Sequence, residues 1–317
     1  MFKRISWLVP ALFLLLSPAG TTAWANEIRV GFMPYLPYTN VLYAKEKRMI
    51  EEELEKAGID KRLRWVQFSS GGLVSEGMAA GELDVAILGI VPAAIGRAAG
   101  QDTRIIALGS TAPKSHALVA RKDLNLSSVT ELKGKRVATT YGSTVYELLY
   151  RILEEAGMTV RDIELINMQP PDMNISLRNK TIDAAVVWDP LLPRLRVDGV
   201  VDELRDGTGI NDNINVIIAR GAYLEDEPDA VAAMLRGIAR ANQEIGTASD
   251  EAAAMFATTF DLPKEVSKNA LENYHYSLRV SELVKEQIKT SMGFLREERI
   301  IRRPVDVEAF LDLSFME

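Results

Sequence analysis

The stretch TIDAAVVWDP, residues 181–190, has the apolar run of a buried strand and ends in an indole, a carboxylate and a proline. The earlier stretch AGELDVAILGIVP, residues 80–92, has the same order of an acidic residue, an apolar run and a proline. Asp84 and Asp183 in these stretches lie 99 positions apart. We interpret the two stretches as corresponding strands of two similar lobes, whose ends point toward a shared cleft.

The first 25 residues have the pattern of a secretory signal peptide. Lys3 and Arg4 precede the apolar run 5–16, and Ala-Trp-Ala at 23–25 has the small-x-small form of a cleavage site. The alternative, an uncleaved membrane anchor, needs an apolar run of about 20 residues, and this run is shorter. We therefore expect residues 1–25 to be a cleaved signal peptide and the mature chain to be a freely soluble periplasmic protein.

Charge and composition exclude several kinds of partner. Without Lys3 and Arg4 the chain has 35 basic and 44 acidic residues, a net charge of −9, which disfavours nucleic acid and anionic lipid. The chain has no cysteine and only two histidines, His116 and His275. We therefore expect no disulfide, no dedicated transition-metal site and no cofactor.

The rest of the chain alternates short β-branched runs with amphipathic segments, which is typical of an α/β fold with mostly parallel sheets covered by helices. Its length of 317 residues suits two domains. Strands are expected at 28–32, 64–68, 83–89, 104–110, 117–123, 163–169, 182–190 and 213–220, with one more inside 131–144. Helices are expected at 41–57, 72–80 and 144–155, from residue 170 onward, and throughout the region after residue 228.

The order of strands and helices restarts near residue 131, which indicates a structural repeat. We predict that residues 26–117 and 216–317 form the first lobe and that residues 118–215 form the second. The strands at 117–123 and 213–220 are expected to cross between the lobes as a two-strand hinge.

Open α/β sheets bind ligands beyond the carboxyl ends of their strands, which selects five loops: 33–40, 89–92, 110–117, 140–144 and 187–190. These loops supply ten candidate ligand-binding residues, namely Tyr35, Tyr38, Gly89, His116, Tyr141, Gly142, Ser143, Thr144, Trp188 and Asp189.

The loop TYGST, residues 140–144, has the pattern of a helix start. Gly142 permits a tight turn, Ser143 or Thr144 can serve as the N-cap, and the run from Thr144 to Glu147 fits a capping box. The amides and partial positive charge of such a helix start can hold an anionic oxygen. The alternative is that these residues only cap their own helix.

Each of the other candidates also has either a ligand-binding or a structural role. Tyr35 and Tyr38 can stack on a flat ligand or enclose a cation, or they can be packing residues at the lobe edge. Trp188 and Asp189 can supply an apolar wall and a hydrogen-bond acceptor, but Asp189 can instead cap the helix that follows it. His116 can contact a ligand or be a structural histidine.

The sequence lacks the common catalytic and nucleotide-binding motifs. The sequence has no GxGxxG after a strand, no GxxxxGK[ST], no GxSxG and no HExxH, and no Ser/His/Asp set has a plausible spacing. We therefore expect a binding protein rather than an enzyme.

Three stretches resemble a known family: GELDVAILGIVPAAIGRAAG (81–100), DLNLSSVTELKGKRVATTYGSTVYELLYRILEEAG (123–157), and VVWDP (186–190) followed by LRDGTG (204–209). Together they are similar to the substrate-binding proteins of ABC importers for aliphatic sulfonates, a family that also includes taurine, nitrate and thiamine-precursor binders. The resemblance extends from about residue 27 to at least residue 228.

The resemblance implies a type II periplasmic binding protein that is usually a monomer, closes on its ligand and delivers it to an inner-membrane ABC permease. It implies that Ser143, Thr144 and Gly142 meet an anionic head group, most simply that of an aliphatic sulfonate or taurine, and that Trp188 and Asp189 line the cleft. The first loop departs from the family in its tyrosines and prolines. A receptor for a thiamine-precursor pyrimidine or another aromatic solute therefore stays open as an alternative. Two other classes also stay open, namely a lyase or cofactor-precursor synthase on the same scaffold and a sensor subunit.

Overall fold

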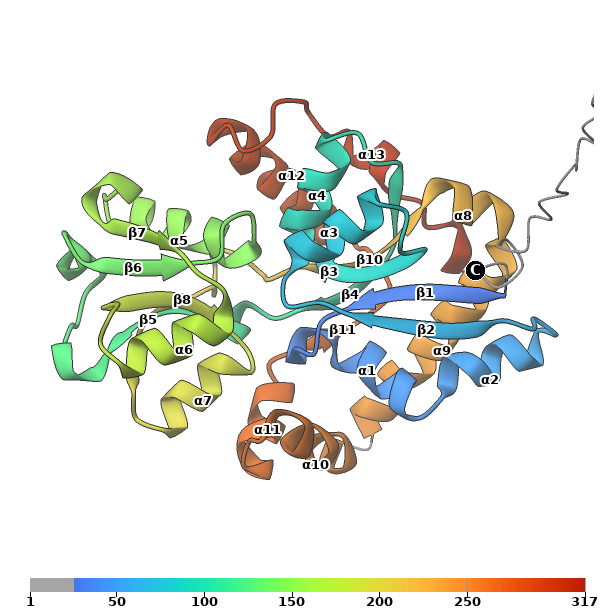
Figure 1. Cartoon of the computed structure of the whole chain (residues 1–317), viewed down its shortest axis with the longest axis horizontal. Helices are drawn as coiled ribbons and strands as arrows, with labels where there is room; N and C mark the ends of the chain where they lie inside the picture. Colours follow the sequence, from blue (N-terminus) through green and yellow to red (C-terminus); the bar gives the residue numbers. More distant parts are fainter. Residues whose placement is uncertain (1–25, 248, 317) are drawn as a thin grey trace, which may run out of the picture.

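The computed structural model describes residues 26–247 and 249–316, so the predicted signal peptide lies outside the described residues. Two β-sheets, each covered by helices, form two lobes that lie side by side (Figure 1). We call the larger unit the first lobe and the smaller one, drawn in green and yellow, the second lobe. This arrangement confirms the predicted α/β fold class.

The first lobe is built on a six-stranded sheet in the order β11-β4-β10-β3-β1-β2. Strands β1, β2 and β3 are parallel, whereas β10 runs antiparallel between β3 and β4. The strands are β1 (Glu27–Phe32), β2 (Arg62–Gln67), β3 (Val85–Gly89), β4 (Thr103–Thr111), β10 (Asn215–Arg220) and β11 (His275–Tyr276).

The second lobe is built on a five-stranded sheet in the order β7-β6-β8-β5-β9. Strands β6, β7 and β8 are parallel, and β5 runs antiparallel between β8 and β9. The strands are β5 (His116–Arg121), β6 (Arg136–Thr139), β7 (Glu164–Asn167), β8 (Ala184–Trp188) and β9 (Val201–Asp206).

Helices cover both sheets, and each lobe has its own apolar core. The first lobe contains α1 (Thr39–Glu46), α2 (Met49–Lys56), α3 (Gly71–Ala79), α4 (Ile90–Ala98), α8 (Gly221–Asp226), α9 (Pro228–Thr247), α10 (Ser249–Phe260), α11 (Lys264–Leu271), α12 (Glu282–Glu297) and α13 (Val307–Phe310). The second lobe contains α5 (Thr144–Glu155), α6 (Pro170–Arg178) and α7 (Leu191–Val197).

The predicted repeat is present down to individual hydrogen bonds. In the first lobe Asp84 accepts bonds from the backbone nitrogen and the guanidinium of Arg29 at 2.6–2.9 Å. In the second lobe Asp183 accepts the same bonds from Arg136 at 2.9–3.1 Å. Each aspartate therefore ties its loop to the first parallel strand of its own sheet.

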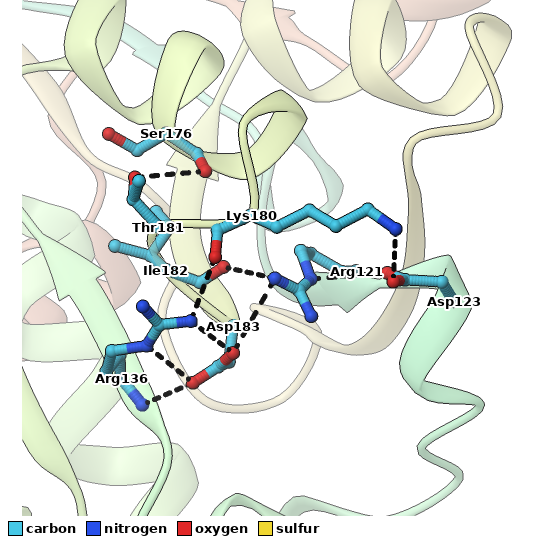
Figure 2. Close-up of polar contacts among 8 residues, drawn as sticks. All are labelled: Arg121, Asp123, Arg136, Ser176, Lys180, Thr181, Ile182 and Asp183. Carbon is cyan, nitrogen blue, oxygen red and sulfur yellow. Dashed lines mark hydrogen bonds and ion pairs between the residues drawn. The ribbon is translucent and has the colours of Figure 1, made fainter.

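A second arginine completes each copy of the repeat. Arg220, at the end of β10, bonds Asp84 at 2.5 Å, and Arg121, at the end of β5, lies 3.8 Å from Asp183. Figure 2 shows the second-lobe copy, in which Arg121 and Arg136 both reach Asp183. The antiparallel strands β10 and β5 thus hold equivalent places in the two sheets.

Three expectations about the chain path were wrong. The single helix expected at 41–57 is divided into α1 and α2, because Arg48 adopts a left-handed backbone with φ 55°. Strands β9 and β11 were not expected. The chain crosses between the sheets at 112–115 and 207–214, so 117–123 and 213–220 do not form the crossings themselves.

Within the part of the chain that the structure describes, no helix is both long enough and apolar enough to cross a membrane.

Candidate functional site

A cavity of about 310 Å³ is lined by residues of both lobes. It lies at the carboxyl ends of parallel strands, where open α/β sheets bind ligands. Its lining residues are Met33, Tyr35, Pro37, Tyr38, Ser69, Ser70, Gly71, Gly72, Leu73, Glu76, Gly89, Pro92, Thr140, Tyr141, Ser143, Thr144, Val145, Gln169, Trp188, Asn213 and Asn215. Seven of the ten candidate residues are in this set, and Gly142, His116 and Asp189 are not.

Helices from both lobes begin at the cavity. Helix α3 starts at Gly71 in the first lobe and α5 starts at Thr144 in the second. The amides in the first turn of a helix have no acceptor within that helix, and the helix dipole makes this end partly positive. The cavity therefore receives partial positive charge from both sides.

The start of α5 follows the predicted helix-start pattern in part. Gly142 has a left-handed φ of 68°, and the Ser143 hydroxyl accepts a bond from the Tyr146 amide at 3.4 Å, so Ser143 is the N-cap. The same hydroxyl donates to the Thr140 carbonyl. Both hydrogen-bonding functions of Ser143 are thus engaged within its own loop, while Thr144 lines the cavity as the first helical residue.

The capping box expected from Thr144 to Glu147 was wrong. The Glu147 carboxylate accepts a bond from Ser291 of α12 at 2.9 Å and pairs with Arg151 at 2.7 Å. Glu147 is buried, and this burial raises its pKa. It therefore links α5 to the first lobe and does not reach back to cap its own helix.

Aromatic side chains form one side of the cavity. The rings of Tyr35 in the first lobe and Trp188 in the second meet edge to face, with centroids 5.9 Å apart. The Tyr35 hydroxyl donates to the Ser69 carbonyl at 2.8 Å, and burial raises its pKa to about 12. Tyr141 also lines the cavity and is 46% exposed, and its ring lies 5.0 Å from that of Tyr146, measured between centroids. We call Tyr35, Tyr141 and Trp188 the aromatic wall.

The remaining first-lobe candidates lie deeper. Tyr38 and Gly89 are buried and still border the cavity. Tyr43, the next tyrosine along the chain, is buried within α1 and is not among the residues that line the cavity.

His116 is enclosed by the protein and is not among the residues that line the cavity. It is fully buried in β5, and its Nε2 lies 3.0 Å from the Asn211 carbonyl, to which it donates. Burial lowers its pKa to about 4, so the ring is neutral near pH 7. This placement matches the structural-histidine alternative.

Asp189 is also buried, next to the cavity residue Trp188. Its Oδ2 accepts a 3.1 Å bond from the hydroxyl of Tyr274, and its amide donates to the Ser115 carbonyl at 2.9 Å. Burial raises its pKa to about 7. It does not cap α7, which starts at Leu191 without a side-chain cap. The alternative helix-cap role was therefore wrong.

Sequence reasoning missed several residues of the cavity. The turn Ser69–Gly72 follows β2 and leads into α3, so the rule that selected the other loops applied to it as well. Gln169, Asn213 and Asn215 also line the cavity. Asn213 belongs to the crossover at 207–214, and no local pattern marks such a segment as part of a site.

The polar groups of the described cavity lining are mostly neutral. They include serine, threonine, asparagine and glutamine side chains and one carboxylate, the exposed Glu76, with no lysine, arginine or histidine among them. Over residues 26–247 and 249–316, no group of three or more histidine, aspartate or glutamate side chains is placed to hold a metal ion. The cavity therefore suits a ligand recognised by neutral donors and helix ends.

Two α/β lobes with such a cavity at their junction are the architecture of the periplasmic binding protein fold. A family model described as NMT1-like family matches residues 22–260, and the chain belongs to that family. This confirms the resemblance inferred from the sequence.

Individual relatives agree with this assignment. A Bacillus subtilis (strain 168) protein named for binding aliphatic sulfonates is 30% identical over all of this chain and 96% of its own length. The alkanesulfonate-binding protein SsuA from Xanthomonas axonopodis pv. citri, solved bound to MOPS, has a TM-score of 0.84 at 22% identity and covers 91% of this chain and 99% of its own. The periplasmic aliphatic sulphonate binding protein SsuA from Escherichia coli has a TM-score of 0.79 at 24% identity, with 90% and 97% covered.

Proposed function

We propose that this protein is the solute-binding component of an ABC importer and that it captures a small organic anion, an aliphatic sulfonate or taurine, in the cavity between its lobes. The observation that carries the proposal is that α3 and α5, from opposite lobes, both begin at this cavity. One anionic group there is stabilised by both helix N-termini at once. A ligand bound by both lobes favours the closed arrangement of the lobes.

A sulfonate suits the neutral polar lining. It stays ionised throughout the pH range in which proteins are folded, so it needs no proton from the site, and it offers three acceptor oxygens. The Thr144 hydroxyl donates to it in our proposal, because Ser143 is engaged in capping α5. Each charge-assisted hydrogen bond of this kind stabilises the complex by about 1.5–3 kcal/mol.

The comparisons support the same ligand class. The Bacillus subtilis relative is named for aliphatic sulfonates, and the Xanthomonas relative was solved with MOPS, itself a sulfonate with a cyclic tail. We carry this ligand class over to the present chain as part of the proposal.

The aromatic wall favours a second candidate, an aromatic solute such as a thiamine-precursor pyrimidine. Tyr35 and Trp188 meet edge to face, and Tyr141 is exposed, so a flat ring can pack against them. A sulfonate with a cyclic tail uses the same surface. The two ligands differ in whether an anionic group is required.

We also propose that the protein is not an enzyme. The named relatives are binding proteins, and the Ser143 hydroxyl donates to a main-chain carbonyl where a nucleophile would need a base. A lyase or synthase would convert its bound ligand. Mass spectrometry of each ligand after incubation with the protein tests this, and any conversion contradicts our proposal.

The remaining parts of the proposal concern location and partners. We place the protein in the periplasm as a monomer, after cleavage behind Ala25, delivering its ligand to an inner-membrane permease. N-terminal sequencing of the exported protein tests the cleavage, and light scattering tests the monomer. Uptake of labelled sulfonate by vesicles containing the permease separates a transport role from a sensor role.

The ligand class is tested first by thermal shift. The panel contains taurine, ethanesulfonate, MOPS, nitrate, bicarbonate and pyrimidines. A ligand at a thousandfold excess over its Kd stabilises the folded state by about 4 kcal/mol, which is a clear rise in Tm. We expect sulfonates to give this rise. A response to pyrimidines alone would select the aromatic candidate.

The site is then tested with two neighbouring variants. Thr144→Val keeps the shape of the side chain and removes its hydroxyl, so we expect sulfonate affinity to fall about tenfold or more in calorimetry. Ser143→Ala removes the helix cap and costs about 1 kcal/mol of stability, so it shows how much affinity is lost when only the start of α5 is disturbed. Unchanged affinity in Thr144→Val would remove this hydroxyl from the site.

A further inference from the structure

Gly89 and Thr144 face each other across the boundary between the lobes. Gly89 ends β3 in the first lobe, and Thr144 begins α5 in the second. A methyl group placed on Gly89 would lie 2.6 Å from Oγ1 of Thr144, closer than real Cβ atoms approach other heavy atoms. The lobes can adopt this arrangement because residue 89 has no side chain.

The local backbone does not require glycine at this position. Gly89 has φ −66° and ψ 154°, an extended conformation that every amino acid adopts. Within its own lobe, the nearest atoms to the added methyl group are Cδ of Pro92 at 3.7 Å and Oδ1 of Asn215 at 3.9 Å, which are ordinary contact distances. Among these three neighbours, only Thr144 of the opposite lobe lies too close to the added methyl group.

A neighbouring pair shows that the lobes are close along this boundary. A methyl group on Gly142, also in the second lobe, would lie 3.3 Å from Cδ1 of Ile95 in α4. Helix α4 follows Gly89 directly, and α5 follows Gly142 by two residues. The start of α5 thus lies close to the first two turns of α4, with Gly89 and Gly142 at the two points of approach.

We propose that Gly89 determines how far the two lobes close, and through closure determines the affinity for the ligand. The inference rests on the proposed function, because a ligand held by both lobes binds best when they close fully. A side chain at residue 89 would meet Thr144 before closure is complete. Gly89 is then a positioning residue at the lobe boundary, and its own contact with the ligand is not required.

The binding experiment uses a graded series, Gly89→Ala and Gly89→Val, with taurine and MOPS as probes. The alanine variant can be relieved by rotation of Thr144, whereas the valine variant cannot. We expect affinity to fall between about fivefold and about a hundredfold, the range that overpacking a tight contact produces, with valine the weaker binder. Gly293→Ala in α12 is the control, because a methyl group there meets nothing within 4 Å.

A rescue variant separates closure from direct obstruction of the ligand. Thr144→Ala removes Oγ1, so adding Gly89→Ala to a Thr144→Ala protein should change its affinity by less than about twofold. If residue 89 instead blocked the ligand itself, the alanine would weaken binding equally in both backgrounds. That outcome would overturn the proposal, as would Gly89→Val binding like the unmodified protein.

Closure itself is measured by energy transfer between two dyes. The chain has no cysteine, so cysteines introduced at the exposed positions Glu55 in α2 and Glu164 in β7 are the only attachment points. We expect the ligand to change the distance between them in the unmodified protein, and Gly89→Val to prevent that change while its thermal unfolding stays cooperative.

The distance between the same two dyes tests this proposal independently of the proposed function. If no sulfonate bound the unmodified protein, the proposed function would fail. The ligand-free distance would still test closure: a longer distance in Gly89→Val than in the unmodified protein supports the role of residue 89. Equal distances overturn it.

Discussion

Tyr274 of the first lobe donates a 3.1 Å hydrogen bond to the carboxyl group of Asp189 in the second, and both side chains are buried. The bond joins the lobes one residue beyond Trp188 of the aromatic wall. Burial raises the pKa of Asp189 to about 7, with the charge of Arg196 acting in the opposite direction. The link between the lobes therefore contains a group that titrates near neutral pH.

We expect Asp189 to make folding stability fall as pH rises from about 4 to about 7. The unfolded carboxyl loses its proton near its ordinary pKa of 3.8, whereas the folded one keeps it up to about 7. At about 1.4 kcal/mol per pKa unit, the whole effect is up to about 4 kcal/mol. Asp189→Asn should flatten this fall in Tm measured at half-unit pH intervals. Parallel pH profiles for the two proteins would contradict it.

We expect His116 to act in the opposite direction. Its pKa is lowered from 6.5 to about 4, so the stability of its buried neutral ring is complete above about 6.5 and is lost as pH falls through about 4. His116→Gln should reduce this acid loss, because an amide can donate to the Asn211 carbonyl without titrating. Circular dichroism from pH 3 to 7 measures this acid unfolding. An Asp189→Asn background is best, because it removes the titration of Asp189. An unchanged acid midpoint would show that His116 does not control it.

We expect the two repeated aspartates to contribute differently to folding stability. The Asp84 side chain is 4% exposed and bonds two arginines closely, whereas that of Asp183 is 14% exposed and bonds one closely. Losing one partner of a buried ion pair costs about 3–5 kcal/mol, which we expect for Asp84→Asn, with a smaller loss for Asp183→Asn. Urea unfolding followed by tryptophan fluorescence compares them, and a larger loss in Asp183→Asn would contradict the burial argument.

Two glycines with the same backbone conformation provide a matched pair. Gly142 and Gly157, before and after α5, both have φ 68°. Alanine at either position should cost about 1–2 kcal/mol of stability. Only Gly142→Ala places a methyl group 3.3 Å from Ile95 of the other lobe, since Gly157 has nothing within 4 Å. We therefore expect similar losses in Tm, but weaker ligand affinity in Gly142→Ala alone. Equal affinities would contradict this distinction.

Much of the fold follows from local sequence, and the exceptions have physical causes. The acidic residue, apolar run and proline marked β3 and β8 because buried parallel strands need continuous apolar runs. The break at Arg48 has no glycine or proline to signal it. Strand β9 was missed because its sequence VDELRD is polar, as an edge strand can be.

The candidate site was also predicted in part from the sequence. Loops at strand ends were found by rule, but the side of the strand that each side chain takes depends on register. Trp188, the last residue of β8, reaches the cavity, whereas Asp189 lies in the turn after the strand, and that turn places its side chain under Tyr274. Asn213 and Asn215 depend on where the chain returns to the first lobe, which is a property of the tertiary structure.

The position of β10 between β3 and β4 has a consequence for the order of assembly as the chain emerges from its N-terminal end. The centre of the larger sheet stays vacant until residue 220 has emerged, whereas every strand of the smaller sheet is available once residue 206 has. Folding in the order of emergence therefore lets the smaller unit mature first. The crossovers 112–115 and 207–214 leave the smaller unit at its two ends. They then hold the strands of the larger sheet that precede and follow the smaller unit near each other while these strands pair.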